Sequence, residues 1–130
     1  MNQGVKDLLA AAEAAVPRIS PEAARRQVAE LDALIVDVRE AEELAQSGKI
    51  GGAIHVARGL LEFRADPESP MHHPAFRRDR AVILYCAAGG RSALAGTALQ
   101  AMGYRSVFNL GALQSWIDSG GAVEHQASCD

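Results

Sequence analysis

A cysteine followed by small residues stands where the hydrophobic pattern of this chain changes. The apolar run 81–85 is typical of a buried strand in a parallel sheet, and it ends at Cys86. Gly89 and Gly90 follow, and a helical pattern begins near Ser92. Strand, tight loop and helix start, in that order, direct backbone N–H groups and the positive end of a helix dipole at one place. Because that place stabilises negative charge, we predict that Cys86 is a thiolate.

The residue types of the loop suit a reactive thiolate. Free cysteine has a pKa near 8.5, so only about 7% is ionised at about pH 7.4. A helix N-terminus and a nearby arginine can lower that pKa by about two units, which ionises about 90% of it. The glycines lack a Cβ that would block an anion, and Ala87 and Ala88 leave the mouth open. Arg91 offers a planar fork of donors to an oxyanion.

The loop has two other possible interpretations. A cysteine at the end of a central strand can be a small buried hydrophobic residue, but that role has no need of Gly-Gly-Arg at a helix start. A glycine-rich nucleotide loop requires Gly-Lys-Ser/Thr or Gly-x-Gly-x-x-Gly, and the segment contains neither pattern.

Length and composition predict one globular domain. The chain has 130 residues, 48% of them apolar, and a net charge of −3 with both signs interleaved. This balance argues against nucleic acid or an anionic membrane as the main partner, and no apolar stretch approaches the length of a membrane span. No secretory signal precedes the domain, so we expect a cytoplasmic location. The second cysteine, Cys129, lies in a polar tail, as an incidental thiol or a resolving thiol rather than a structural disulfide partner.

Alternating helical and strand patterns indicate an α/β fold with a parallel sheet. Segments 4–16, 21–31, 40–46, 93–102 and 112–118 are expected to be helical, and 34–38, 54–56, 81–85 and 104–110 to be strands. Residues 57–80 are expected to form a long irregular connection, whose role the sequence leaves open. Ligands bind at the carboxyl ends of such strands, where Cys86 lies.

Asp37 and Arg39 end the strand that precedes Glu43, also at a carboxyl edge. One hypothesis is that they brace the Cys86 loop, with Asp37 accepting its N–H groups. The other is that Asp37 caps a helix while Arg39 forms a surface ion pair with Glu43. Direct catalysis is disfavoured, because a preformed thiolate needs no general base.

Histidines and two further arginines give weaker signals. His55 could form a dyad with the cysteine or could be a half-buried structural residue. The pair His72-His73 lacks ligand spacing around it, so no metal site is expected. Arg58 and Arg64 either line the approach of an anion or lie on a solvated surface.

Taken together, these motifs resemble the rhodanese homology domain in its single-domain sulfurtransferase form. The resemblance spans residues 19–123, and its pieces occur in family order. They are 35–39 (Ile-Val-Asp-Val-Arg), 48–54 (Gly-Lys-Ile-Gly-Gly-Ala-Ile), 86–92 (Cys-Ala-Ala-Gly-Gly-Arg-Ser), 103–104, 110–111, Trp116 and 120–121. The chain departs from the usual family residues at 49–53, where it has Lys-Ile-Gly-Gly-Ala in place of His-Ile-Pro-Gly-Ala, and at Ala112, where a second glycine is common.

The resemblance implies a five-stranded parallel sheet flanked by helices on both faces. It divides the chain into an N-terminal amphipathic helix extension at 1–17, a rhodanese-like domain at 18–124 and a flexible tail at 125–130. The activity that the resemblance implies needs no metal and no cofactor, apart from a persulfide formed on the protein itself.

The resemblance also implies a reaction. Cys86 would take a sulfane sulfur from a small donor such as thiosulfate, and cyanide, a thiol or a partner protein would accept it. The residues that would hold the persulfide are Ala87, Ala88, Gly89, Gly90, Arg91 and Ser92. Related phosphatases and arsenate reductases have a loop one residue longer than the four residues between Cys86 and Arg91 here. A non-enzymatic persulfide carrier or regulatory module is the other alternative, and the chain would act as a monomer or homodimer.

Overall fold

The computed structural model describes residues 2–125, which form a central parallel sheet between two layers of helices. The helices are α1 (Val5–Ala15), α2 (Pro21–Leu31), α3 (Ala41–Ser47), η1 (Arg58–Leu60, a 3-10 turn), α4 (Leu61–Ala65), α5 (Gly90–Ala101) and α6 (Leu113–Asp118). The strands are β1 (Leu34–Asp37), β2 (Lys49–Ile50), β3 (Ile54–His55), β4 (Val82–Cys86), β5 (Val107–Ala112) and β6 (Val123–Glu124).

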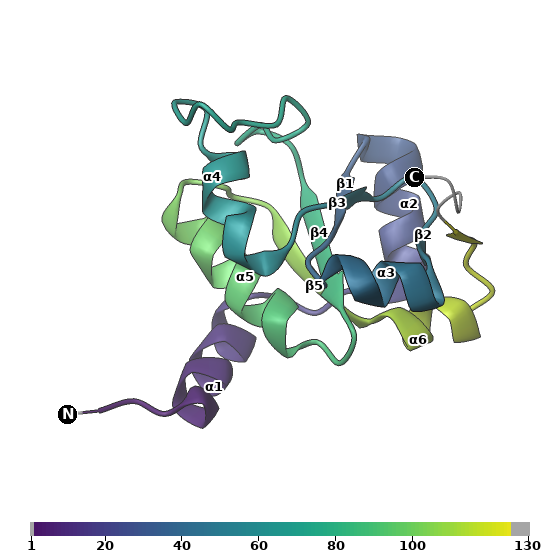
Figure 1. The fold of residues 1–130 in the computed structure, drawn as a ribbon, viewed down its shortest axis with the longest axis horizontal. Coiled ribbons are helices and arrows are strands. Elements are labelled where there is room, and N and C mark those ends of the chain that lie inside the picture. Colours follow the sequence, from purple (N-terminus) through teal and green to yellow (C-terminus); the bar gives the residue numbers. More distant parts are fainter. Residues whose placement is uncertain (1, 126–130) are drawn as a thin grey trace.

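The main sheet has the order β3-β1-β4-β5, and all its pairs are parallel. Figure 1 shows α1, α4 and α5 on one side of this sheet and α2, α3 and α6 on the other. The α/β fold and its two helical layers are therefore confirmed. The expected five strands are corrected to four, because the neighbour of β5 on its outer side is a single parallel bridge between Arg18 and Asn109. That segment turns into α2 too soon to extend the pairing.

The burial of β1 and β4 explains the continuous apolar runs of the sequence. Every residue of both strands is buried, since helices cover both faces. One core cluster lies under α1, α4 and α5 and includes Val16, Leu61 and Leu99. The other lies under α2 and α6 and includes Ala24 and Trp116.

The N-terminal helix α1 packs against α5. Gly96 of α5 allows this close approach, because a Cβ there would lie 2.8 Å from both γ carbons of Val16. Leu9 reaches the first turn of α5 at Gly90. The extension is therefore packed against the rest of the domain. It borders the loop of residues 86–91, called the sulfur loop below because it contains the Cys86 sulfur.

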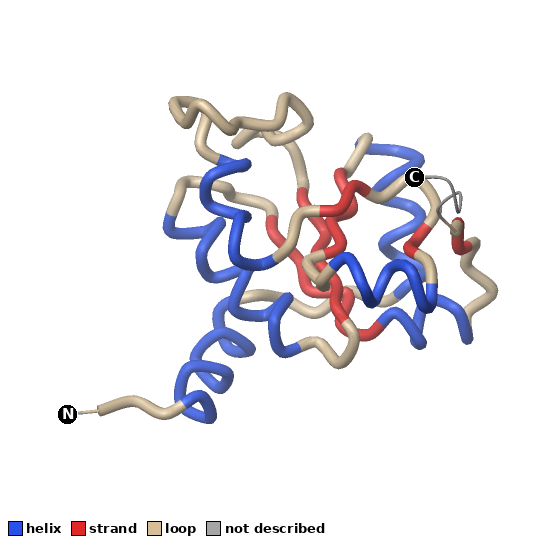
Figure 2. The backbone as a smooth tube through the Cα atoms, viewed as in Figure 1, coloured by secondary structure: helices blue, strands red, loops and turns tan. Residues whose placement is uncertain are grey.

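Several expected features differ in detail. The strand expected at 104–110 is β5 at Val107–Ala112, because a turn follows α5 first, and the antiparallel pair β2–β6 was not expected. Segment 57–80 contains η1 and α4 before its loop, which Figure 2 shows as a long connection into β4. α5 begins at Gly90, three residues earlier than expected, because Gly89 at φ 101° serves as the N-terminal cap. Of the expected tail, residues 126–130, including Cys129, lie outside the described part of the chain. No helix within residues 2–125 is long and apolar enough to cross a membrane.

Candidate active site

Cys86 is the last residue of β4 and lies next to the N-terminus of α5. Its side chain is 1% exposed, while Ala87 and Ala88 are exposed above it. The Gly89 N–H donates to Cys86 Sγ at 3.0 Å. The structure thus places the sulfur inside a turn whose amide hydrogens face it.

The surroundings of the sulfur favour the ionised form. Burial by itself raises the pKa of Cys86. Hydrogen bonds from the Ser92 side chain and from the amides of Ser92, Gly89 and Ala88 outweigh that effect. The pKa of Cys86 is therefore lowered below its ordinary value, as the position of the residue in the sequence predicts.

Ser92 and Asn109 form a buried polar chain behind the sulfur. Ser92 Oγ lies 3.4 Å from Cys86 Sγ and donates to Asn109 Oδ1 at 2.7 Å. The Asn109 amide is fixed in this orientation, since its Nδ2 donates to the Gly89 carbonyl at 3.2 Å and its Oδ1 also accepts the Gly111 N–H at 2.9 Å. The single hydroxyl hydrogen of Ser92 must therefore choose between Asn109 and the thiolate.

This competition limits what Ser92 contributes to the thiolate. We expect Ser92→Ala to raise the pKa of Cys86, but by less than the loss of a free hydroxyl bond to a charge would. The measurement is the pH dependence of Cys86 alkylation by iodoacetamide, with Cys129→Ala in both proteins so that only one thiol reacts. A Ser92→Ala profile that is unchanged, or shifted to lower pH, would contradict this account.

Asn109 was not identified from the sequence. It is 1% exposed in β5 and links that strand to the loop residues Ser92 and Gly89. The available signal was a lone amide in an otherwise apolar strand, because a buried polar group must find hydrogen-bond partners.

Arg91 is fixed by an ion pair that the sequence did not indicate. Its two terminal nitrogens donate to Glu43 of α3 at 2.7 and 2.9 Å, a bidentate arrangement. This pairing lowers the pKa of Glu43 to about 2, chiefly through the Arg91 hydrogen bonds. The same bonds raise the pKa of Arg91, and Cys86 adds to that rise as a nearby negative group. Arg91 therefore lies beside the sulfur with its outer edge already occupied.

The Glu43–Arg91 pair makes stability depend on pH in the acid range. Because the folded-state pKa of Glu43 is depressed, its stabilisation is present above the unfolded value of about 4.5 and is lost as pH falls towards 2. Both side chains are about one third exposed, so we expect Glu43→Gln to cost no more than about 1 kcal/mol at pH 7. Urea unfolding at pH 7 and at pH 3 checks this, and a difference between the two proteins that grows at low pH would contradict it.

Asp37 and Arg39 are buried and bound to each other, which corrects both hypotheses for them. Arg39 donates through Nε and Nη2 to the Asp37 carboxylate at 2.8–3.1 Å. Its remaining bonds go to Ser47 Oγ at 2.8 Å and the Gly48 carbonyl at 2.5 Å. Asp37 does not accept loop N–H groups, and Glu43 pairs with Arg91 rather than Arg39. The buried pair holds the end of α3, so any support it gives the sulfur loop is indirect.

The remaining candidates lie in structural positions. His55 Nε2 is 2.7 Å from the Arg39 carbonyl, which agrees with a half-buried structural histidine. Arg58, in η1, forms an ion pair with Glu62 at 2.9 Å. The rings of His72 and His73 bond to nearby backbone groups of the same loop. No group of His, Cys, Asp and Glu among residues 2–125 is arranged to hold a metal ion.

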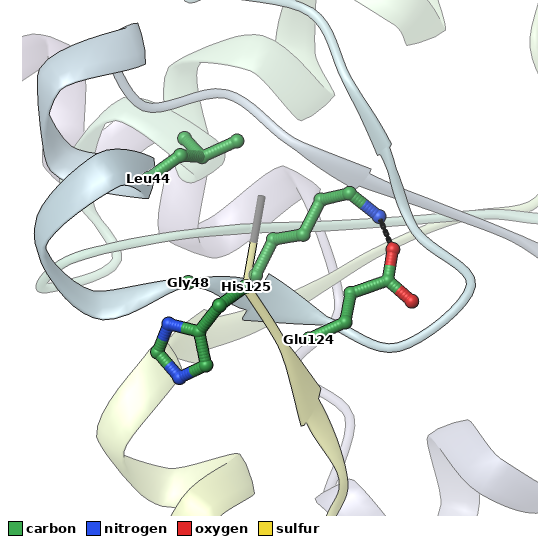
Figure 3. A pocket seen from close by; sticks show the side chains of 5 residues that line it. Leu44, Gly48, Glu124 and His125 are labelled. Atoms are coloured by element: carbon green, nitrogen blue, oxygen red, sulfur yellow. Dashed lines mark hydrogen bonds and ion pairs between the residues drawn. The ribbon is translucent and has the colours of Figure 1, made fainter. Parts of the chain in front are cut away.

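A small cavity of about 50 Å³ lies at the C-terminal end of α3, between Leu44, Gly48, Lys49, Glu124 and His125 (Figure 3). Lys49 of β2 forms an ion pair with Glu124 of β6, and both residues line the cavity. Space of this size admits little more than water, so we regard it as a packing gap beside the β2–β6 pair.

Comparison with known proteins decides the family. A family model described as a rhodanese-like domain matches residues 20–119. The chain belongs to the rhodanese-like family. A sulfurtransferase of Allochromatium vinosum is 37% identical over 90 residues, which cover 68% of this chain and 76% of that protein.

Two solved structures with similar folds match nearly the whole chain. A protein of unknown function from Rhodopseudomonas palustris, described as a possible tyrosine phosphatase, is 37% identical with a TM-score of 0.86 over 95% of this chain and 96% of that one. The polysulfide-sulfur transferase homodimer of Wolinella succinogenes is 26% identical with a TM-score of 0.74, covering 95% of this chain and 88% of that one. Coverage of 95% means that these likenesses extend beyond the matched rhodanese-like segment.

Proposed function

We propose that this rhodanese-like protein is a sulfurtransferase that carries sulfane sulfur as a persulfide on Cys86. One observation carries the proposal: a thiol of lowered pKa receives the Gly89 N–H at 3.0 Å inside a loop with four residues between Cys86 and Arg91. The sulfurtransferase relative and the polysulfide-sulfur transferase structure support the same class of reaction.

The first half-reaction loads the sulfur. The Cys86 thiol releases its proton to solvent, and the thiolate attacks the outer sulfur of a donor such as thiosulfate. A Cys86 S–S bond forms, the donor S–S bond breaks, and sulfite leaves with the electron pair. The terminal sulfur of the persulfide keeps one negative charge, for which the amides of Ala87–Ser92 are the available donors.

The second half-reaction unloads the sulfur. Cyanide, or a cellular thiolate in its place, attacks the terminal sulfur and forms a new bond to it. The persulfide S–S bond breaks, and its electron pair returns to Cys86 as the thiolate. No oxidant, metal or cofactor is required for either step, and the protein returns to its starting state.

The experiment is a two-substrate rate measurement with thiosulfate and cyanide, with thiocyanate as the product. A persulfide intermediate predicts ping-pong kinetics, seen as parallel lines in double-reciprocal plots. Loading of sulfur from thiosulfate without turnover would instead identify a persulfide carrier. Hydrolysis of a phenyl phosphate with no loading of sulfur would overturn the proposal in favour of a cysteine phosphatase.

A further inference from the structure

Arg18 reaches the sulfur loop from outside the segment that matches the family model. It lies between α1 and α2, in the stretch that passes beside β5 in Figure 1, and its backbone pairs with Asn109. A Cβ on Gly111 would lie 2.4 Å from Arg18 Nη2, and a Cβ on Gly89 would lie 3.5 Å from Nη1. The guanidinium therefore lies against the two glycines that border the loop.

The absence of side chains at these two glycines leaves the space that the Arg18 guanidinium occupies. Gly89 has φ 101° and Gly111 has φ 93°, so both adopt backbone conformations that favour glycine. At Gly111 a side chain would also occupy the space of the guanidinium itself. Gly89 lies next to the Arg18 guanidinium, and its N–H donates to Cys86 Sγ. This one residue therefore connects the guanidinium to the sulfur.

The two arginines next to the Cys86 loop differ in what they can bind. Arg91 lies on the α3 side and is engaged bidentately by Glu43. Arg18 lies on the β5 side and is exposed, and within residues 2–125 no carboxylate pairs with it and no group accepts a hydrogen bond from its guanidinium. The cation available to an incoming anion is therefore Arg18.

We propose that Arg18 binds the negatively charged leaving group of the sulfur donor. The inference rests on the proposed sulfur transfer at Cys86. As the donor S–S bond breaks, the electron pair stays on the leaving group, and the Arg18 guanidinium stabilises that charge. Arg91, held by Glu43, orients the loop and contributes less to anion binding.

The test compares a neutral and an anionic reagent of similar size at the same sulfur. Cys86 is alkylated with iodoacetamide and with iodoacetate in the Cys129→Ala background, and plateau rates are taken at a pH where the thiol is fully ionised. We expect Arg18→Gln to lower the iodoacetate rate about threefold to tenfold relative to the iodoacetamide rate, and Arg18→Lys to restore part of it. Added salt should shrink the difference.

Arg105→Gln is the matched control. It removes the same charge from an exposed position that precedes β5, whereas Gly111 lies near the end of that strand. Equal rate ratios in Arg18→Gln and Arg105→Gln would overturn the inference. Because alkylation needs no sulfur transfer, a changed ratio in a protein that forms no thiocyanate would refute the proposed function and leave anion binding by Arg18 intact. An unchanged ratio in a protein that does form thiocyanate would refute anion binding by Arg18 and leave the proposed function intact.

Discussion

Cys86→Ala is expected to lower thiocyanate formation from thiosulfate and cyanide by at least about 1000-fold, because the variant has no sulfur to carry the persulfide. Ser92 and the loop amides, which favour the thiolate, remain in place, but the variant has no thiolate for them to stabilise. Initial rates at saturating concentrations of both substrates measure the effect.

Two controls separate lost chemistry from lost structure. Circular dichroism and the unfolding midpoint of Cys86→Ala should stay close to those of the parent protein, since alanine fits the buried position with only one atom removed. Cys129→Ala should retain full activity. Substantial turnover in Cys86→Ala, or a loss of turnover in Cys129→Ala, would move the reacting thiol away from the loop.

Asp37→Asn is expected to destabilise the fold by about 3–5 kcal/mol, because it leaves the Arg39 charge buried without its partner. Asp37 is 0% exposed and Arg39 is 3% exposed, and three hydrogen bonds join their side chains. Urea unfolding, followed by the fluorescence of the single tryptophan, Trp116, gives the free energy of unfolding.

An exposed ion pair provides the comparison for this effect. Glu62→Gln breaks the pair with Arg58 at the protein surface and should cost less than about 1 kcal/mol. A loss for Asp37→Asn no larger than that for Glu62→Gln would show that the buried pair does not hold β1 to the end of α3. Any Asp37→Asn protein that remains folded should still load sulfur, since the carboxylate makes no contact with the thiol.

Much of the fold could be predicted because short sequence patterns, such as apolar runs and helix caps, indicate individual strands and helices. The apolar run at 81–85 fits only a strand covered on both faces, and Ser20-Pro21 starts α2 where a capping serine and an N1 proline predict it. The hydrophobic pattern predicted four strands for the main sheet, which agrees with the structure, and the fifth strand was expected from the family resemblance alone. The short α4 was missed because five residues give too little helical periodicity.

The sequence predicted the residues of the Cys86 loop but not the side chains from other elements that bind to it. Cys86, Gly89 and Arg91 lie within six residues of one another, so their chemistry could be inferred from their spacing. The partners of that loop come from other strands and helices: Glu43 from α3, Asn109 from β5 and Arg18 from the segment before α2. Which carboxylate meets which arginine depends on side-chain reach across the sheet edge, and sequence spacing does not determine it.

The location of the transferred sulfur tests the central claim most directly. The protein is incubated with thiosulfate, freed of excess donor and analysed by mass spectrometry, first intact and then as peptides. We predict the gain of a single sulfur atom on the peptide that contains Cys86, and its removal by cyanide with release of thiocyanate. A protein that gains no sulfur, or gains it on Cys129 with Cys86 unmodified, would contradict the assignment of Cys86 as the sulfur carrier.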